Sequence, residues 1–261
     1  MPIIPNPSLA RLRAGQVSIG FGVHHLRTVA TPALAKAAGY DWLFIDMEHG
    51  AFSVQEATQL CMAALPVGIA PLVRVCTDAL DEGTRALDNG AQGIIIPHVD
   101  TPQLAQRIAS AFRFPPQGHR SWGGPVASHG FMPPAHDVAQ REINNEILVI
   151  GMIETAQAVA NADAIAAVPG IDCLFIGTSD LSADMGIAGQ IGHPKVVASY
   201  EAVIAACKKH GKYAGVGGVY DDEWAPRYLK MGARFILAGS DQQFLFSGAK
   251  ARFGFLSDVK I

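Results

Sequence analysis

Short apolar runs recur along this 261-residue chain, and several of them follow a helical pattern that ends in a glycine. Glycine just past a helix adopts the left-handed conformation without steric cost, and a continuous apolar run is typical of a strand covered on both faces. The pattern therefore predicts a parallel sheet whose strands alternate with helices. The expected strands are Val17–Phe21, Trp42–Ile45, Pro71–Val75, Ile94–Ile96, Leu148–Ile153, Cys173–Ile176, Tyr213–Val216 and Phe235–Leu237.

Helical patterns fill the segments between these runs. Eight strand–helix units in about 250 residues match the size and order of a TIM (β/α)8 barrel, and residues 1–261 are expected to form one domain. A doubly wound open sheet is the alternative that the same alternation allows. The expected helices cover residues 30–38, 53–65, 79–89, 101–111, 155–167, 195–210, 222–231 and 241–250.

Composition and charge exclude several classes of function. Apolar residues make up 49% of the chain, which is enough for a large core, and the net charge of -3 without a basic run disfavours nucleic acid and anionic membranes as partners. No apolar stretch approaches the roughly 20 residues of a membrane span. The first 20 residues lack a signal-peptide pattern and the four cysteines are widely spaced, so a cytoplasmic protein with reduced thiols is expected.

One segment departs from the regular alternation. Phe112–Asn145 is rich in proline and glycine, which predicts a long ordered loop after the fourth strand. Long loops of this kind often serve as lids over an active site. His119, Arg120 and Trp122 are therefore expected either to close over a substrate or to form an exposed loop tip.

Carboxylates stand at the ends of two consecutive predicted strands. Glu154 directly follows the strand 148–153, and Asp180 follows the strand 173–176. Because adjacent strands lie only ~4.8 Å apart, both side chains are expected to converge at the barrel mouth. Two carboxylates with water and a chelating substrate commonly hold Mg²⁺ or Mn²⁺. The alternative is that each carboxylate caps the start of a helix.

An arginine at the end of the third predicted strand is a second candidate. Arg74 lies on a strand that should be crowded on both faces, so its guanidinium must meet an anion or suffer a large desolvation cost. A substrate oxygen is a natural partner for it. The alternative is a structural salt bridge with Glu48 or Glu154.

A histidine follows the second predicted strand. Imidazole is suited to proton transfer near neutral pH, and Asp46, three residues before His49, could orient the ring and hold its tautomer. Histidines also cap helices, so this pair gains weight only from the neighbouring arginine and carboxylates. The sequence thus predicts an acid–base group beside a metal and an oxyanion-binding arginine.

Other polar residues at the strand ends are weaker candidates. His24, His25 and His98 could be ligands, but none has a second metal-binding residue three or four positions away. The turns 217–218 and 239–240 could bind phosphate through backbone N–H groups or merely allow tight turns. No lysine follows a predicted strand, so carbonyl chemistry would need a metal rather than a Schiff base.

Six segments carry motifs that are specific in combination. They are Tyr40–His49, Pro71–Val75, Gly90–Pro97, Ile153–Thr155, Phe175–Ser182 and Gly192–Pro194. Their order and spacing resemble those of the HpcH/HpaI family of class II 2-oxo-acid aldolases across nearly the whole chain. The resemblance implies a TIM barrel and a divalent cation, Mg²⁺, Mn²⁺ or Co²⁺, that Glu154 and Asp180 would bind.

The resemblance also implies roles for single residues. Arg74 matches the arginine that binds the keto and enolate oxygen of pyruvate, and His49 matches the histidine that transfers a proton through water together with an aspartate, here Asp46. The backbone around Ser179 and Asp180 matches the turn that holds the substrate carboxylate. Arg74, Ser179 and Asp180 are thus the expected substrate-binding residues.

Two further expectations come from the family. Its members are typically hexamers with exchanged C-terminal helices, so residues 241–261 are expected to pack on a neighbouring subunit. The chain also departs from the family, because Met152 stands where many relatives have a glutamine that contacts substrate or metal-bound water, and the segment 119–129 differs from the usual arginine–glycine pattern near Arg120.

The leading hypothesis is reversible aldol cleavage of a 4-hydroxy-2-oxo acid to an aldehyde and pyruvate, or a close analogue such as hydroxypyruvate. One alternative keeps the barrel and the metal but makes the enzyme a phosphoenolpyruvate or acyl-CoA type lyase. A second alternative is a catalytically silent oxo-acid binding protein on the same scaffold. The combination of acid–base, metal and oxyanion groups favours the aldolase.

Overall fold

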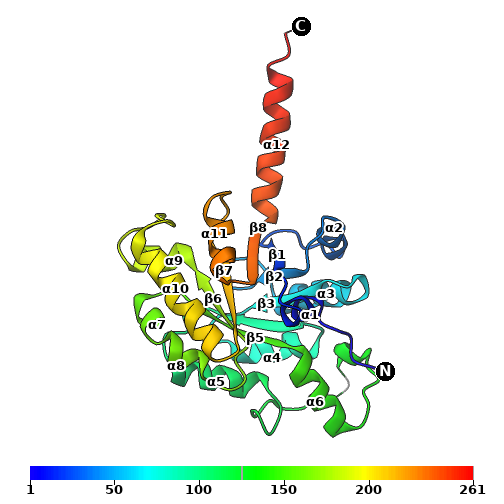
Figure 1. The fold of residues 1–261 in the computed structure, drawn as a ribbon. Coiled ribbons are helices and arrows are strands. Elements are labelled where there is room, and N and C mark those ends of the chain that lie inside the picture. Colours follow the sequence, from blue (N-terminus) through cyan, green and yellow to red (C-terminus); the bar gives the residue numbers. More distant parts are fainter. Residues whose placement is uncertain (125, 261) are drawn as a thin grey trace.

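The computed structural model describes residues 1–124 and 126–260. Within them the eight strands form a closed parallel barrel in sequence order, with β8 paired to β1 (Figure 1). The predicted TIM barrel is therefore confirmed and the open sheet is excluded. The strands are β1 (Ser18–Val23), β2 (Trp42–Asp46), β3 (Ala70–Arg74), β4 (Gly93–Ile96), β5 (Leu148–Ile153), β6 (Cys173–Gly177), β7 (Tyr213–Gly217) and β8 (Phe235–Ser240).

Helices cover the outside of the barrel, and most of the predicted ones lie where expected (Figure 1). The helix expected at 155–167 is divided at Asn161, and the structure adds α1, α6 and α9. The helices are α1 (Pro7–Arg13), α2 (Thr31–Ala37), α3 (Val54–Val67), α4 (Leu80–Asp88), α5 (Pro102–Phe112), α6 (His136–Glu146), α7 (Ala156–Ala160), α8 (Ala162–Ala166), α9 (Thr178–Asp184), α10 (Pro194–Lys209), α11 (Trp224–Met231) and α12 (Asp241–Ser257).

The core has an inner and an outer layer. Large side chains from alternate strand positions fill the barrel, where the rings of Trp42 and Phe235 stack with centroids 4.0 Å apart. Leu9 and Leu12 of α1 belong to the same cluster, so α1 closes the amino-terminal end of the barrel. The outward-facing strand residues form the second layer with the surrounding helices. The filled barrel leaves the carboxyl ends of the strands as the place for a site.

The segment expected to be one long loop is divided in the structure. Residues 136–146 form α6, and a short 3-10 turn covers Ala127–His129. The segment follows α5 rather than a strand, so it lies at the amino-terminal end of the barrel, where the backbone of Ser128 bonds Ile4. The lid expectation is therefore wrong for the described residues. Pro125 of this segment lies outside the described residues.

The side chain of Arg120 is buried in this segment and not free to close over a substrate. Its Nη2 donates to Asp88 at 2.7 Å, and its guanidinium lies 4.6 Å from the centroid of the Phe114 ring. Trp122 packs against the rings of Phe114 and His136. The proline and glycine content thus predicted the irregular part of the segment before α6. The contacts of Arg120 and Trp122 show that this part packs against the barrel domain.

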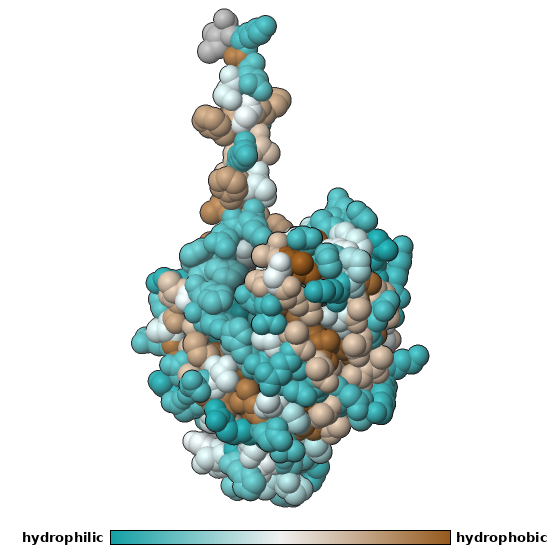
Figure 2. Space-filling view, turned by 90° about the vertical axis from the view of Figure 1, so that its left-hand side faces the viewer, coloured by the Kyte–Doolittle hydropathy of each residue, from teal (hydrophilic) through white to brown (hydrophobic). Residues whose placement is uncertain are grey.

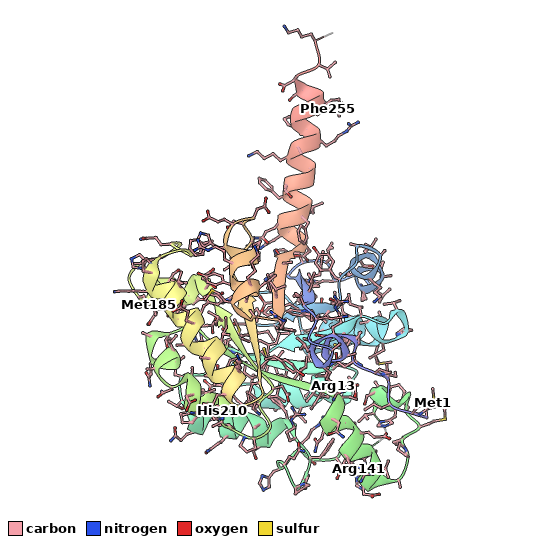
Figure 3. The ribbon with its side chains drawn as sticks, in the orientation of Figure 1. Met1, Arg13, Arg141, Met185, His210 and Phe255 are labelled. Carbon is pink, nitrogen blue, oxygen red and sulfur yellow. The ribbon has the colours of Figure 1, made fainter. Side chains whose placement is uncertain are left out.

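The last helix projects away from the barrel (Figure 1). Near its start Phe244 contacts Phe21 and Tyr40, with ring centroids 5.5 and 6.2 Å apart. Farther along α12, apolar side chains are exposed. Figure 2 shows them on the projecting helix, and Figure 3 labels one of them, Phe255. None of the described helices is long and apolar enough to cross a membrane. Ile261, at the end of the segment expected to be exchanged, lies outside the described residues.

Candidate active site

A pocket of about 320 Å³ opens at the carboxyl ends of the strands. Five of the six predicted site residues line it: His49, Arg74, Glu154, Ser179 and Asp180. The sixth, Asp46, is fully buried beneath them. The closed barrel thus brings together residues that lie up to 131 positions apart in the chain, from 49 to 180. The volume suits a ligand of metabolite size.

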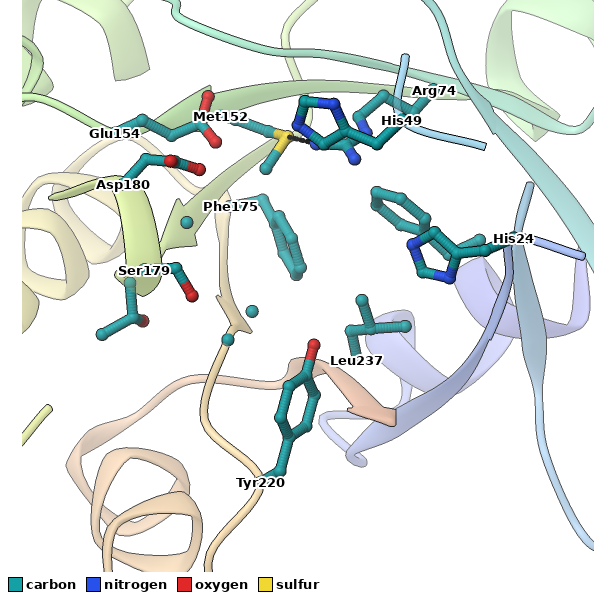
Figure 4. A pocket seen from close by; sticks show the side chains of 15 residues that line it. His24, His49, Arg74, Met152, Glu154, Phe175, Ser179, Asp180, Tyr220 and Leu237 are labelled. Carbon is teal, nitrogen blue, oxygen red and sulfur yellow. Dashed lines mark hydrogen bonds between the residues drawn. The ribbon is translucent and has the colours of Figure 1, made fainter. Parts of the chain in front are cut away.

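Glu154 and Asp180 stand side by side at one end of this pocket (Figure 4). Glu154 directly follows β5 and is only 2% exposed, whereas Asp180 lies in the first turn of α9 just after β6. A Cβ atom on Gly177 would come within 2.6 Å of the Glu154 Oε1, so only glycine leaves room for the carboxylate. The predicted convergence of the two carboxylates is present in the structure.

The environment of Glu154 makes its ionised form less stable than that of an exposed carboxylate. Burial raises the pKa of Glu154 to about 6, and the negative charge of Asp180 adds to the increase. The backbone N–H of His98 opposes it by donating to Glu154 Oε2 at 2.8 Å. His98 adopts a φ of 52° and its Nδ1 lies 3.5 Å from the same oxygen. A cation at this end would relieve the repulsion between the carboxylates.

Arg74 and Asp46 form a bidentate ion pair below the opposite side of the pocket. The two residues are register partners on β3 and β2. Asp46 Oδ1 accepts from Arg74 Nε at 2.9 Å, and Oδ2 accepts from Nη2 at 2.6 Å. Nη1 lies 2.8 Å from Glu48 Oε2, and the ring of Phe44 lies under the guanidinium at 5.0 Å. The guanidinium is therefore fixed in direction but keeps N–H groups for another partner.

These contacts set the charges of the pair. Burial alone would raise the pKa of Asp46, but hydrogen bonds from His24 and Arg74 hold it well below its usual range. Burial likewise acts to lower the pKa of Arg74, but the bonds and charge of Asp46 and the charge of Glu48 raise it above the ordinary value. Asp46 is consequently an ionised acceptor and not a proton donor at neutral pH.

His49 is placed at the edge of the pocket. Its side chain is 66% exposed, and its Nε2 lies 4.0 Å from Glu48 Oε2. Asp46 Oδ1 accepts the backbone N–H of His49 at 3.2 Å, and no bond joins the Asp46 carboxylate to the His49 ring among the described residues. Asp46 therefore shapes the turn that carries His49. The imidazole in contact with its carboxylate is that of His24, whose Nε2 lies 3.1 Å from Oδ2.

Two further residues line the pocket although the sequence pattern indicated one of them only weakly and the other not at all. His24, just after β1, has no partner at helical spacing, so only its position at a strand end could have indicated it. Tyr220, in the loop between β7 and α11, carried no signal, but its hydroxyl points into the pocket (Figure 4). Both lie on the side away from Glu154 and Asp180. The pocket thus has a carboxylate end and a wall of ring side chains.

Met152 and the glycine turns have different surroundings. Met152 lines the pocket on β5, and its sulfur lies 3.9 Å from Arg74 Nη1. Gly217 and Gly218 line the pocket beside Ser179, so this turn is available to a ligand. A Cβ on Gly239 would come within 2.4 Å of the Phe244 ring. Glycine in the second turn therefore leaves the space into which Phe244 of α12 packs.

Comparisons with known proteins identify the family of this chain. Residues 28–247 match the model of the HpcH/HpaI aldolase/citrate lyase family. The chain is 39% identical to a 4-hydroxy-4-methyl-2-oxoglutarate aldolase from Hapsidospora irregularis, covering 95% of this chain and 93% of the relative, and 36% identical to a 5-keto-4-deoxy-D-glucarate aldolase from Shigella boydii, covering 92% of each. A crystal structure of an HpcH/HpaI aldolase from Desulfitobacterium hafniense superposes with a TM-score of 0.89 at 29% identity, covering 97% of each chain. The chain belongs to the HpcH/HpaI aldolase/citrate lyase family.

Proposed function

We propose that this protein catalyses reversible, metal-dependent aldol cleavage of a 4-hydroxy-2-oxo acid to an aldehyde and pyruvate, or a close analogue such as hydroxypyruvate. The single observation that carries the proposal is that Glu154, Asp180 and Arg74 face one pocket of metabolite size. The similarity to proteins named as oxo-acid aldolases supports the same reaction class.

Glu154 and Asp180 fit a divalent cation such as Mg²⁺, Mn²⁺ or Co²⁺. Their carboxylates share one end of the pocket, Gly177 leaves the space that Glu154 occupies, and the pKa of Glu154 is raised as expected for a carboxylate that lacks a strong cationic partner. Two carboxylates leave open positions for water and substrate, which is usual for Mg²⁺. When bound, the cation would supply Lewis-acid stabilisation of negative charge on substrate oxygens.

Arg74 is the protein's own group for the enolate oxygen. Asp46 holds two of its N–H groups and Glu48 lies 2.8 Å from Nη1, which fixes the guanidinium before substrate arrives, and an N–H group not directed at either carboxylate would bind the keto oxygen. Negative charge grows on that oxygen as the C–C bond breaks, so a donor already in place stabilises the transition state more than the substrate. The backbone around Ser179 and Asp180 would hold the substrate carboxylate.

His49 would act as the base that accepts the proton of the substrate 4-hydroxyl group. Cleavage requires a base that removes the proton of the 4-hydroxyl group, and the exposed imidazole at the pocket edge can do so directly or through water. Asp46 supports this role by holding the backbone N–H of His49. Among the described residues no lysine lines the pocket, so a Schiff base has no amine here.

The projecting α12 supports an oligomer in which this helix is exchanged, a hexamer by family resemblance. Ile19 on the outer face of β1 is 37% exposed, whereas Leu43 and Ile45 on the outer face of β2 are completely buried. In a closed (β/α)8 barrel a helix after β8 would cover β1, but α12 leaves the barrel instead. The exposed Phe253 and Phe255 would be covered by packing on a neighbouring subunit.

A retro-aldol screen tests the proposal. A set of 4-hydroxy-2-oxo acids is incubated with the protein and Mg²⁺, Mn²⁺ or Co²⁺, and release of pyruvate or hydroxypyruvate is followed. We expect cleavage that EDTA abolishes reversibly. Full turnover in chelator would contradict the metal role, and metal-dependent binding of pyruvate without cleavage or methyl-proton exchange in D₂O would favour a silent binding protein.

A further inference from the structure

His24 joins the predicted site residues in a way that their proposed roles do not use. Its side chain lines the pocket, and its Nε2 lies 3.1 Å from Asp46 Oδ2, the oxygen that also accepts from Arg74 Nη2. Because Asp46 is ionised, its oxygens only accept, so a His24 ring with its hydrogen on Nε2 can donate to Oδ2. Oδ2 of Asp46 is therefore held from two sides.

All other hydrogen bonds that the Asp46 carboxylate accepts come from backbone N–H groups or from Arg74. Oδ1 accepts from Arg74 Nε and from the backbone N–H groups of Glu48 and His49, at 2.9, 3.0 and 3.2 Å. His24 is consequently the one side chain besides Arg74 with a nitrogen within 3.1 Å of this carboxylate among the described residues. Without it, Oδ2 would keep a single partner and the carboxylate could rotate away from the geometry that the guanidinium requires.

His24 itself is held by a buried carboxylate. Asp241, the first residue of α12, is 3% exposed and accepts the backbone N–H groups of His24, His25 and Leu26 at distances of 2.7 to 3.2 Å. Although burial acts to raise the pKa of Asp241, these bonds lower it. Successive N–H groups around one carboxylate make a rigid turn. The turn after β1 is thereby fixed, and with it the origin of the His24 side chain.

We propose that His24 is a positioning residue for Arg74: its imidazole locks the Asp46 carboxylate, which in turn aims the guanidinium at the enolate oxygen. The inference rests on the proposed function, because Arg74 is assumed to bind that oxygen. It predicts that loss of the His24 bond slows enolate formation as well as C–C cleavage, since both steps place charge on the same atom.

The test compares amide replacements of His24. His24→Gln carries its amide nitrogen near the position of Nε2 and can still donate to Asp46, whereas His24→Asn is too short to do so. We expect His24→Asn to lower kcat for retro-aldol cleavage and for methyl-proton exchange of pyruvate in D₂O together, on the order of tenfold, and His24→Gln to recover most of both rates. His25→Gln is the matched control, because the adjacent imidazole bonds Gln242 and does not line the pocket.

A double-mutant cycle decides whether His24 acts through Arg74. In an Arg74→Lys background the bidentate geometry is already lost, so His24→Asn should cost less than about twofold more. Equal losses in both backgrounds, equal rates for His24→Asn and His24→Gln, or loss of cleavage with exchange retained would each overturn the inference. Absence of cleavage and exchange in the unmutated protein would instead refute the proposed function. Melting temperatures of all variants exclude unfolding as the cause.

Discussion

Carboxylates stand at two places around the pocket, each at the ends of two neighbouring strands. The pKa of the buried carboxylate is shifted in opposite directions at the two places. At the ends of β2 and β3, Asp46 faces Arg74 and its pKa is lowered. At the ends of β5 and β6, Glu154 faces Asp180 and its pKa is raised to about 6. The same barrel geometry thus completes an ion pair on one side and leaves unbalanced negative charge on the other.

On the first side the protein supplies its own positive charge, whereas on the second side a positive charge would have to be bound from solution. Arg74 is a permanent cation whose direction is fixed by Asp46, so it is ready for an oxyanion without reorganisation. Within the described residues no arginine forms an ion pair with Glu154 or Asp180, so a divalent cation from solution would complete their side. Five experiments break or sharpen this contrast.

Removing a carboxylate from the unbalanced side should have the largest effect. We expect Asp180→Ala to abolish tight metal binding and to lower kcat/KM for cleavage roughly 10³-fold, which corresponds to several kcal/mol of lost transition-state stabilisation. Titration calorimetry with Mn²⁺ and the coupled pyruvate assay measure both effects. Glu201→Gln on the exposed surface of α10 is a control that removes a charge elsewhere. Normal metal affinity in Asp180→Ala would disprove the assignment.

Breaking the balanced side should cost both activity and stability. Arg74→Ala removes the proposed oxyanion donor, which should lower kcat about 10²-fold, and it leaves Asp46 buried without its arginine partner, which should lower the free energy of unfolding by about 3 kcal/mol. Steady-state kinetics and urea unfolding measure the two losses.

The double variant Asp46→Leu with Arg74→Met separates these losses. It removes both buried charges, so stability should recover toward that of the unmutated protein while activity stays low. Recovery of activity along with stability would mean that Arg74 is a structural ion pair and not an oxyanion donor.

The two sides should also respond differently to pH. The pKa of Glu154 is raised to about 6, so the carboxylate is mostly ionised at pH 7 and mostly protonated at pH 5, and protons would compete with the proposed metal below pH 6. We expect metal affinity to fall about tenfold from pH 7 to pH 5. The lowered pKa of Asp46 keeps the arginine side ionised throughout this range, so the stability due to that pair is lost only below about pH 4. Metal titrations at several pH values, compared with urea unfolding at the same values, would show whether the two events separate.

The smallest effect is expected at Met152, which lies between the two sides. Its sulfur is 3.9 Å from Arg74 Nη1 and can form only a weak bond. Met152→Gln would offer an amide oxygen to Arg74 or to metal-bound water, worth about 1 kcal/mol and therefore a change of about fivefold in metal affinity or KM. Met152→Leu keeps the apolar volume and should leave both unchanged. A hundredfold loss in Met152→Gln would show that the sulfur site does not accept a polar group.

The sequence predicted the barrel and most of the site because both depend on local order. Apolar runs and glycine ends locate all eight strands, and residues directly after parallel strands must meet at one end of a closed barrel. Glu154, Asp180 and Arg74 are therefore readable from position alone. The helices α1 and α6 were missed because their patterns lie in segments rich in proline and glycine or outside the strand–helix units.

Which side chain contacts which was decided by the tertiary structure. Sequence proximity paired Asp46 with His49, but a turn places the backbone of His49 against the carboxylate while its ring points to the pocket edge. The imidazole that reaches Asp46 belongs to His24, just after the neighbouring strand β1. Strand order fixes which ends are adjacent, whereas side-chain direction depends on turns, rotamers and packing from distant segments, such as Asp241 against the β1 turn, that no local pattern encodes.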